Sequence, residues 1–426
     1  MKVLVIGNGG REHSIIWKLS KSPNVEKIYC TIGNAGIFKQ AEVLNIDVND
    51  FVSLSYFATQ KKIDYTFVGP EVPLAKGIVD YFNSKNLKIF GPSKKGAMLE
   101  SSKAFAKDFM KKYGIRTAEY SAFDDFKSAH NFLKSWEDNK KIVVKADGLA
   151  AGKGVVMCQN KQEAEDAVKA MMQDKVFGDS GTKIVFEEWL EGEEVSVLVF
   201  TDGKHFSIMP PAQDHKRVGD GDTGLNTGGM GAYAPAPIAT PELIKSINDD
   251  ILPKILTGFQ KEKIDYKGVL YIGFMIVKGQ PYVLEFNCRF GDPETEAILP
   301  LLETDLSDIV VHILEGRLNE IDIKWSNKAS VCVVLSSGGY PEKYDTGIPI
   351  YGLDKISEDE AIVFHAGTAK DLENEPVTSG GRVIAMTSVA EDIKSAIDKV
   401  YKAVEKVKFM KMHYRKDIAQ RALKNG

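Results

Sequence analysis

The segment LEFNCRFGDPETE, residues 284–296, concentrates side chains that can bind a small cation or a phosphate group. Side chains alternate between the two faces of a strand, so Glu285, Asn287 and Arg289 would share one face, with neighbouring heads roughly 6–7 Å apart. The opposite face would be apolar and contain Leu284, Phe286, Cys288 and Phe290. The segment therefore predicts a binding site on a strand. The alternative is a half-solvated antiparallel strand whose polar face lies in water.

The turn GNGGREH, residues 7–13, follows the apolar segment KVLVIG and invites comparison with nucleotide-binding loops. The dinucleotide pattern G-x-G-x-x-G would need glycine where Glu12 stands, and no acid ends the second apolar segment to hold a ribose. Both mismatches argue against a nicotinamide cofactor. A helix that starts here would have free backbone N–H groups, so Gly9, Gly10 and Arg11 are predicted to bind a phosphate group. Two alternatives remain: the glycines only turn the chain, or Glu12 binds an amine or a hydroxyl group.

A second glycine-rich segment, KADGLAAGKGVV, spans residues 145–156 between two expected strands. It is not a P-loop, because Gly148 and Gly152 are one residue too close together and Lys153 is followed by glycine rather than serine or threonine. A hairpin loop of small residues with a lysine could still cover a triphosphate. Lys145 lies on an apolar strand, where an unpaired ammonium group is costly, so we expect it to face an anion.

Two further segments carry candidate nucleotide contacts. Lys103 in SSKAFAKDF is a second candidate for a phosphate contact, although a single lysine on a helix is often only solvated. In VFEEWLEGEEVSV, an apolar strand ends in two acids that are followed by Trp189 and Leu190. Such a connector could bind adenine through its backbone, with Glu194 on the ribose hydroxyl groups. The alternative is an acidic turn exposed to solvent.

Composition narrows the class of protein. The chain has 426 residues, which suggests about three domains. Lys and Arg number 55 against 59 Asp and Glu, a net charge of −4 without long runs of one sign, so we do not expect a nucleic acid partner. No apolar run reaches the roughly 18 residues of a membrane helix and no signal peptide precedes the first strand, so we expect no membrane association and a cytoplasmic location. The four cysteines are far apart, which favours buried thiols over disulfides or a zinc site.

Apolar segments and helical patterns divide the chain into successive units. In residues 1–102, short apolar strands alternate with helical stretches, which predicts a Rossmann-like α/β domain with a parallel sheet. Residues 117–190 form a compact α+β unit, and residues 326–426 a C-terminal α+β domain. The other expected elements are helical stretches at 94–114, 241–262 and 294–316 and a hairpin at 268–290. The fold class is therefore a multidomain combination of α/β and α+β units.

Taken in order along the chain, Lys103, Lys145, the glycine loop, EEWLEGEE and the strand EFN resemble the ATP-grasp family. Within that family the chain is similar to the ligases that join glycine to 5-phosphoribosylamine, and the likeness covers essentially all 426 residues. The most telling motifs are NTGGMGAYAP and RFGDPET. The resemblance implies an ATP-grasp core of two α+β subdomains, with the main subdomain at 103–116 and 191–325 and the lid subdomain at 117–190.

The resemblance also implies a reaction in two steps. ATP would phosphorylate the carboxylate of glycine to give glycyl phosphate, and the amine of 5-phosphoribosylamine would then displace phosphate. The product would be glycinamide ribonucleotide, formed in purine biosynthesis. The implied partners are ATP, glycine and 5-phosphoribosylamine, with Mg²⁺ or Mn²⁺ as the cofactor and no protein nucleophile. We expect a monomer or a weak homodimer.

Each candidate residue takes a role from this resemblance. Glu285 and Asn287 would bind the metal ion, and Lys145 and Arg289 would neutralise charge during catalysis. The ATP-binding residues would be Lys103, Lys145, Gly152, Lys153, Glu187, Trp189, Leu190 and Glu194. The substrate-binding residues would be Gly9, Gly10 and Arg11 at the 5′-phosphate, Asp214 beside an amine, and Arg289.

The chain departs from the family pattern at two positions. Ile32 stands where proline is usual, and Glu296, which receives no predicted role, stands where glutamine is usual. Two other interpretations share the ATP-binding residues. One is a carboxylating ATP-grasp enzyme, which would depend on bicarbonate. The other is a regulatory protein that binds a nucleotide without turnover, which would need neither the metal strand nor Lys145.

Overall fold

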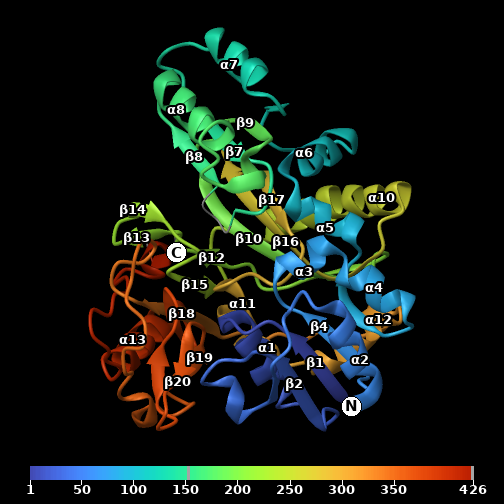
Figure 1. Cartoon of the computed structure of the whole chain (residues 1–426), viewed down its shortest axis with the longest axis vertical. Helices are drawn as coiled ribbons and strands as arrows, with labels where there is room; N and C mark the ends of the chain where they lie inside the picture. The colour runs from blue at the N-terminus through green and yellow to red at the C-terminus, as the bar shows by residue number, and fades with distance from the viewer. Residues whose placement is uncertain (151–153, 424–426) are drawn as a thin grey trace.

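The computed structural model describes residues 1–150 and 154–423. In Figure 1, a lobe with the helices α7 (Phe126–Lys134) and α8 (Lys161–Met172) projects above a broad base. The N-terminal part of the chain, in blue, and the C-terminal part, in orange and red, lie side by side in that base. Within the described residues, no helix is both long and apolar enough to cross a membrane.

The N-terminal sheet is parallel, as predicted. Its strands are β1 (Lys2–Ile6), β2 (Lys27–Thr31), β3 (Glu42–Leu44), β4 (Tyr65–Val68) and β5 (Ile89–Pro92), and its helices are α1 (Gly10–Leu19), α2 (Phe51–Lys61), α3 (Glu71–Lys76) and α4 (Ile78–Ser84). The strand order is β3-β2-β1-β4-β5. Val3 and Val5 of β1 lie in one apolar cluster and Leu4 and Ile6 in another, so both faces of the sheet are covered.

The same sheet continues into antiparallel strands. These are β10 (Glu193–Thr201), β11 (Phe206–Ile208), β16 (Tyr266–Val277) and β17 (Gln280–Asn287). β5 and β17 pair with successive stretches of one edge of β16, and β10 pairs with the other edge. The predicted hairpin is therefore confirmed as β16 and β17. One sheet supports both the turn at Gly9 and the strand that carries Glu285.

The upper lobe has a sheet and a core of its own. Its strands, in spatial order, are β6 (Tyr120–Phe123), β9 (Ile184–Glu188), β7 (Ile142–Ala146) and β8 (Val155–Cys158). β7 and β8 pair antiparallel, which confirms the expected hairpin around the glycine-rich segment. Ala129 and Leu133 of α7 pack with Val144 and Phe186 in a separate apolar cluster. This four-stranded unit is called the lid sheet below.

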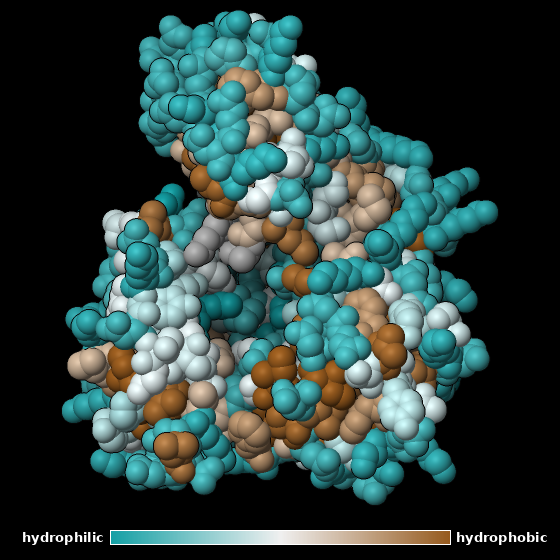
Figure 2. Space-filling model, viewed as in Figure 1, coloured by the Kyte–Doolittle hydropathy of each residue, from teal (hydrophilic) through white to brown (hydrophobic). Residues whose placement is uncertain are grey.

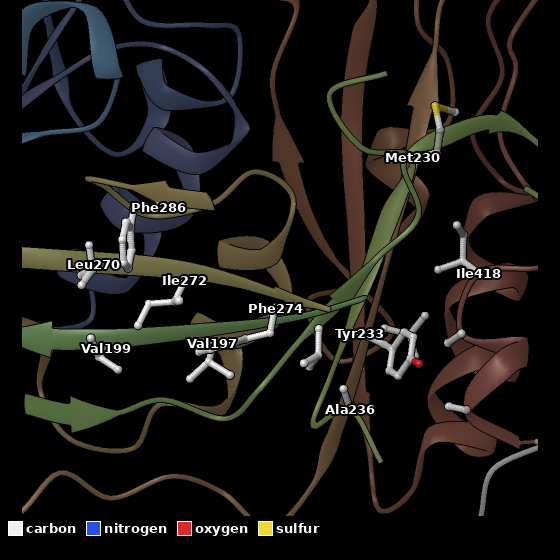
Figure 3. Packing of buried hydrophobic residues seen from close by; sticks show 14 of the residues in the cluster. Val197, Val199, Met230, Tyr233, Ala236, Leu270, Ile272, Phe274, Phe286 and Ile418 are labelled. Carbon is white, nitrogen blue, oxygen red and sulfur yellow. The ribbon is translucent and has the colours of Figure 1, made fainter. Parts of the chain in front are cut away.

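The C-terminal part forms a five-stranded sheet that two earlier strands join. In spatial order the strands are β12 (Gln213–Asp214), β15 (Gly231–Ala234), β18 (Ala329–Ser336), β22 (Arg382–Ala390) and β19 (Ile362–His365), and α13 (Ile393–Val404) packs against β18 and β22. Figure 3 shows Val197, Phe274 and Phe286 of the large sheet in one cluster with Tyr233 and Ile418. A continuous core therefore joins the large sheet to the C-terminal part.

Two predicted helices are interrupted. The stretch 94–114 is two helices, α5 (Lys94–Ser101) and α6 (Lys103–Lys112), because Ser102 is extended and its side chain caps α6 by accepting the N–H of Phe105. The stretch 294–316 is α11 (Glu294–Ile298), a 3₁₀ turn at Leu299–Leu301 and α12 (Leu306–Leu314). Pro300 in that turn has no N–H to continue a helix. By contrast, 241–262 is helical throughout, as α9 (Pro241–Ser246), a π-helical stretch at Ile247–Ile251 and α10 (Leu252–Glu262).

The C-terminal tail fastens the hairpin β13 (Arg217–Gly219) and β14 (Thr223–Asn226), which follows Asp214 in the chain. Arg415 is only 1% exposed. It donates two hydrogen bonds of 2.7 Å to Asp417 and one of 2.7 Å to Asp222. Arg421 donates to the same Asp222 carboxylate at 3.0 and 3.1 Å. The tail thereby fixes the hairpin beside Asp214.

We predict that Arg415→Met lowers the free energy of unfolding by about 2–4 kcal/mol, because it leaves two carboxylates without their buried partner. Arg421→Met is the matched control, since this arginine is more exposed and binds the same Asp222; we expect a loss of less than about 1 kcal/mol. Urea unfolding followed by circular dichroism measures both. Equal losses in the two variants would contradict the prediction.

Candidate active site

Glu285 and Asn287 lie on β17, as predicted, but the alternation of faces is interrupted at Leu284. Glu285 pairs with Gly273 and Val283 with Phe274, so Leu284 is the extra residue of a β-bulge. Val283, not Leu284, is buried in one apolar cluster with Phe286 and Cys288, whereas Phe290, beyond the end of β17, is buried in another cluster. The prediction for Leu284 is therefore wrong, the one for Phe286 and Cys288 is confirmed, and Phe290 is buried as expected but packs elsewhere. Beyond the bulge, Glu285 and Asn287 have the spacing i, i+2 that places both on the polar face.

Arg289 is held by acids from two helices of the N-terminal part. Its Nη2 lies 2.7 Å from Oε1 of Glu100 in α5, and its Nε 3.5 Å from Oε2 of Glu71 in α3. Nη2 also donates to the side-chain oxygen of Asn287 at 3.4 Å. Burial disfavours the charge of Arg289, but Glu100 and Glu71 outweigh it and raise its pKa. The guanidinium group is thus fixed beside the amide of Asn287.

The predicted lysines converge on Glu285 and Glu187. Lys145 Nζ lies 2.8 Å from Oε1 of Glu187, and Lys103 Nζ donates to the carbonyl of Gly148 at 3.2 Å. Burial disfavours the charge of Glu285, but Lys216, Lys145, Lys103 and Arg289 outweigh it and lower its pKa. Glu285 is therefore a carboxylate near neutral pH, which is the form that binds a cation.

Asp214 belongs to a second cluster of acids. Burial raises the pKa of Asp214 to about 7; Lys216 opposes this rise, and Glu294, Glu194 and Glu285 add to it. Lys216 Nζ lies 2.6 Å from Oε2 of Glu194. Glu294 accepts hydrogen bonds from the hydroxyl groups of Tyr271 and Ser196 at 2.9 and 3.1 Å. Elements far apart in the chain thus bring one lysine and four carboxyl groups together.

The turn at the start of α1 lines a cavity of about 850 Å³ between the N-terminal and C-terminal parts. Gly9, Gly10, Thr368 and Arg382 are among its lining residues. Arg11 is not, because its guanidinium group is buried against Oε1 of Glu12 at 2.5 Å and the carbonyl of Phe290 at 3.3 Å. The prediction that Gly9, Gly10 and Arg11 bind a phosphate group stays a prediction, and the geometry separates Arg11 from the two glycines.

The connector after β9 holds two more of the predicted residues. Trp189 is half-buried, with the Lys141 ammonium group 5.0 Å from its ring centre, and Leu190 is also half-buried. Gly152 and Lys153 lie outside the described residues. Figure 2 shows this face of the molecule hollowed between the lid sheet and the base, with hydrophilic side chains inside the hollow.

Three residues of the site, Lys107, Lys216 and Glu294, were not predicted from the sequence. Lys107 follows Lys103 by one helical turn, and Lys216 follows Asp214 by two residues, so their spacing was a usable signal. Among the described residues, there is no group of three or more His, Cys, Asp or Glu side chains that could hold a metal ion. A cation at Glu285 and Asn287 would take its other ligands from water or from phosphate groups.

Glu296 is fully buried, and neither oxygen of its carboxyl group has a hydrogen-bond partner among the described residues. Burial raises the pKa of Glu296 well above its ordinary value, and Asp292 adds to the rise. A side chain on Gly10 would meet Oε1 of Glu296 at 2.6 Å. Glu296 therefore lies directly beneath the turn that lines the cavity, and burial favours its uncharged form.

Three family models match the chain in succession. The N domain of phosphoribosylglycinamide synthetase matches residues 1–100, its ATP-grasp (A) domain residues 101–295, and its C domain residues 330–421. The chain is 50% identical over 420 residues to a phosphoribosylamine–glycine ligase of Caldanaerobacter subterraneus, covering 98% of this chain and 99% of that one. It is 46% identical over 426 residues to the ligase of that name from Haemophilus influenzae, covering 99% of both chains.

Solved structures give the same result. A phosphoribosylamine–glycine ligase from Thermotoga maritima superposes with a TM-score of 0.84 at 33% identity, covering 98% of this chain and 100% of that one. The biotin carboxylase domain of the Hydrogenobacter thermophilus 2-oxoglutarate carboxylase has a TM-score of 0.74 at 16% identity, covering 100% of this chain and 98% of that one. The second likeness is one of fold. Both support the expected fold class, in which α/β and α+β units surround an ATP-grasp core.

We predict that Glu296→Gln stabilises the protein at pH 7–8. The pKa of Glu296 is higher in the folded than in the unfolded chain, so its contribution to stability is present at low pH and is lost as the pH rises. Glutamine does not titrate, and we expect the melting temperature to rise by roughly 2–4 °C at pH 8, with the gain disappearing near pH 4.5. The exposed Glu26→Gln is the control. A lower melting temperature for Glu296→Gln at pH 8 would contradict the prediction.

Proposed function

Because the chain belongs to the phosphoribosylglycinamide synthetase family of ATP-grasp ligases, we propose that it joins glycine to 5-phosphoribosylamine with cleavage of ATP to ADP and phosphate. The product is glycinamide ribonucleotide, a compound of purine biosynthesis. The observation that carries the proposal is the match of all three family models, in order, along nearly the whole chain. The convergence of Lys103, Lys145 and Lys216 on the carboxylate of Glu285 supports it.

ATP would lie between the lid sheet and β17. Lys103 and Lys145 would face its phosphate groups, with the segment that contains Gly152 and Lys153 above them. The adenine would meet the connector formed by Glu187, Trp189 and Leu190, and the ribose hydroxyl groups would share Glu194 with Lys216.

Glu285 and Asn287 fit a divalent metal ion. Both offer oxygen atoms, and the lysines and Arg289 keep Glu285 ionised, so the pair suits a hard cation that takes its other ligands from phosphate groups. We propose Mg²⁺, with Mn²⁺ as the alternative. When bound, the ion would neutralise charge on the transferring phosphoryl group. Arg289, held by Glu100 and Glu71, would orient Asn287 and bind an anionic oxygen of the substrate.

The chemistry requires positioning rather than a protein nucleophile. The carboxylate of glycine would attack the γ-phosphorus of ATP and release ADP, and the resulting glycyl phosphate would be attacked by the amine of 5-phosphoribosylamine, releasing phosphate. The attacking amine must lose a proton as the carbon–nitrogen bond forms. Asp214, whose pKa is raised to about 7 by burial, is suited to orient that amine and to accept the proton.

The phosphoribosyl group would occupy the cavity of about 850 Å³. Gly9 and Gly10 would contact it with their backbone, and Arg382, 2.8 Å from Asp292, would supply positive charge at the wall of the C-terminal part. Arg11 would act from behind the turn by holding Glu12, which accepts the N–H of Gly9 at 2.6 Å. We propose that the protein is a monomer or a weak homodimer.

ADP release tests the function. The purified protein is given ATP and Mg²⁺ with either glycine or bicarbonate, each with and without 5-phosphoribosylamine. We expect sustained ADP release only when glycine and 5-phosphoribosylamine are both present. Release that depends on bicarbonate would indicate a carboxylating enzyme instead, and nucleotide binding without any release would indicate a regulatory protein.

We predict that Glu285→Gln lowers the rate of ADP release by about 100-fold or more, because the cation loses its charged ligand. Glutamine has nearly the same shape, so circular dichroism should match that of the unchanged protein. The matched control is Glu391→Gln, an exposed residue paired with Lys328, which should leave the rate unchanged. A rate for Glu285→Gln near that of the control at ordinary Mg²⁺ concentrations would remove Glu285 from the metal site.

A further inference from the structure

Glu187 carries an ion pair on each side. Lys107 Nζ lies 2.9 Å from its Oε2, and Lys145 Nζ lies 2.8 Å from its Oε1. The three residues are 1%, 3% and 7% exposed in the order Lys107, Glu187 and Lys145, so bulk water screens these charges little. They come from α6, β9 and β7, which belong to the base and to the lid sheet.

Lys107 has a second contact that fixes it to the large sheet. Its ammonium group donates to Oγ1 of Thr117 at 2.7 Å, and that hydroxyl group donates to the carbonyl of Val283 at 2.6 Å. Val283 lies on β17, two residues before Glu285. Lys107 therefore contacts β9 of the lid sheet directly and, through Thr117, β17, the strand of the proposed metal site.

The charges of this cluster do not cancel. Two ammonium groups face one carboxylate, which leaves one net positive charge at a site that is almost inaccessible to water. If Lys107 were absent, the carboxylate of Glu187 would be paired only with Lys145. The net charge of that pair would be zero, and it would not attract an anion. With Lys107 present, the negative charge of Glu187 is shared, and Lys145 keeps attraction for a phosphate group. A lysine that only filled a gap in the core would have no such effect on a ligand.

We infer that Lys107 is a positioning residue for nucleotide binding: it holds Glu187 from behind, so that Lys145 remains directed, and positively charged, toward the triphosphate. The inference rests on the proposed function, since it concerns the same ATP site. Burial disfavours the charge of Glu187, but Lys145 and Lys107 outweigh it and lower its pKa, as the arrangement requires.

The first test is equilibrium binding of a fluorescent, non-hydrolysable ATP analogue in the presence of Mg²⁺. We expect Lys107→Met to weaken binding by about 10-fold and Lys145→Met by at least as much. Lys111→Met is the matched control, because Lys111 lies one turn further along α6 with its side chain exposed, and it should bind as tightly as the unchanged protein. Melting curves of the variants verify that each is folded.

A second test uses pH, and its first part needs only the unchanged protein. Burial lowers the pKa of Lys107 to about 8, against the opposing effect of Glu187. The other charged groups that face it are Lys145 on β7 and Glu285 on β17. The protonated form binds the nucleotide better, so the affinity of the unchanged protein should fall as the pH rises through about 8. Lys107→Met should lack that part of the fall.

The outcomes separate the two proposals. If Lys145→Met binds the analogue as tightly as the unchanged protein, the nucleotide site lies elsewhere and the proposed ATP site is wrong. If Lys145→Met binds weakly but Lys107→Met retains full affinity and the same pH profile, Lys107 only fills the core and the inference is overturned. An affinity of the unchanged protein that is constant from pH 7 to pH 9 would also overturn it.

Discussion

The structure depends on the pairing of charges that are removed from water. Taking an ion out of water costs several kcal/mol, and an opposite charge about 4 Å away returns roughly 4 kcal/mol at an effective dielectric constant of about 20. For such a pair, the cost of burial and the attraction between the charges nearly cancel. A ligand that brings further charge can therefore change the sign of the net free energy. Glu187, Glu285 and Arg289 are all in this situation, each with partners of opposite charge on other elements.

Because the partners come from different elements, the ion pairs also link parts of the structure that are far apart in the chain. Arg289, just beyond β17, is joined to α5 and α3, and Glu187 on β9 is joined to α6. The lid sheet has its own apolar cluster, whereas the large sheet shares a core with the C-terminal part. The two sheets thus belong to separate apolar cores, and the contacts between them include the polar ones that Lys107, Lys103 and Ala104 of α6 make. Polar contacts of this kind between two sheets can rearrange when a charged ligand binds, whereas a packed apolar core resists rearrangement.

Features that depend on the spacing of nearby residues could be predicted from the sequence. Features that depend on contacts between distant segments could not. The alternation along β17 placed Glu285, Asn287 and Arg289 on one polar face, but the bulge at Leu284 depends on the register with β16. The breaks at Ser102 and Pro300 had local signals, a capping serine and a proline, that the helical pattern obscured. The match of Lys107 with Glu187, eighty residues apart in the chain, had no signal in the sequence beyond the helical spacing of Lys107 from Lys103.

Two buried glutamates show how position alone decides the state of one side chain. Glu187 and Glu296 are both nearly inaccessible to water, at 3% and 0% exposure. Glu187 pairs with two lysines and its pKa is lowered, whereas the carboxyl oxygens of Glu296 have no hydrogen-bond partner among the described residues and its pKa is raised. Glu187 is therefore kept charged where the lid sheet meets the base, at the proposed nucleotide site. Glu296 is favoured in its uncharged form beneath the turn of Gly10, which lines the cavity. A carboxylate there would add negative charge beneath a site for an anionic substrate, so an uncharged Glu296 is compatible with phosphate binding in a way that an ionised one is not.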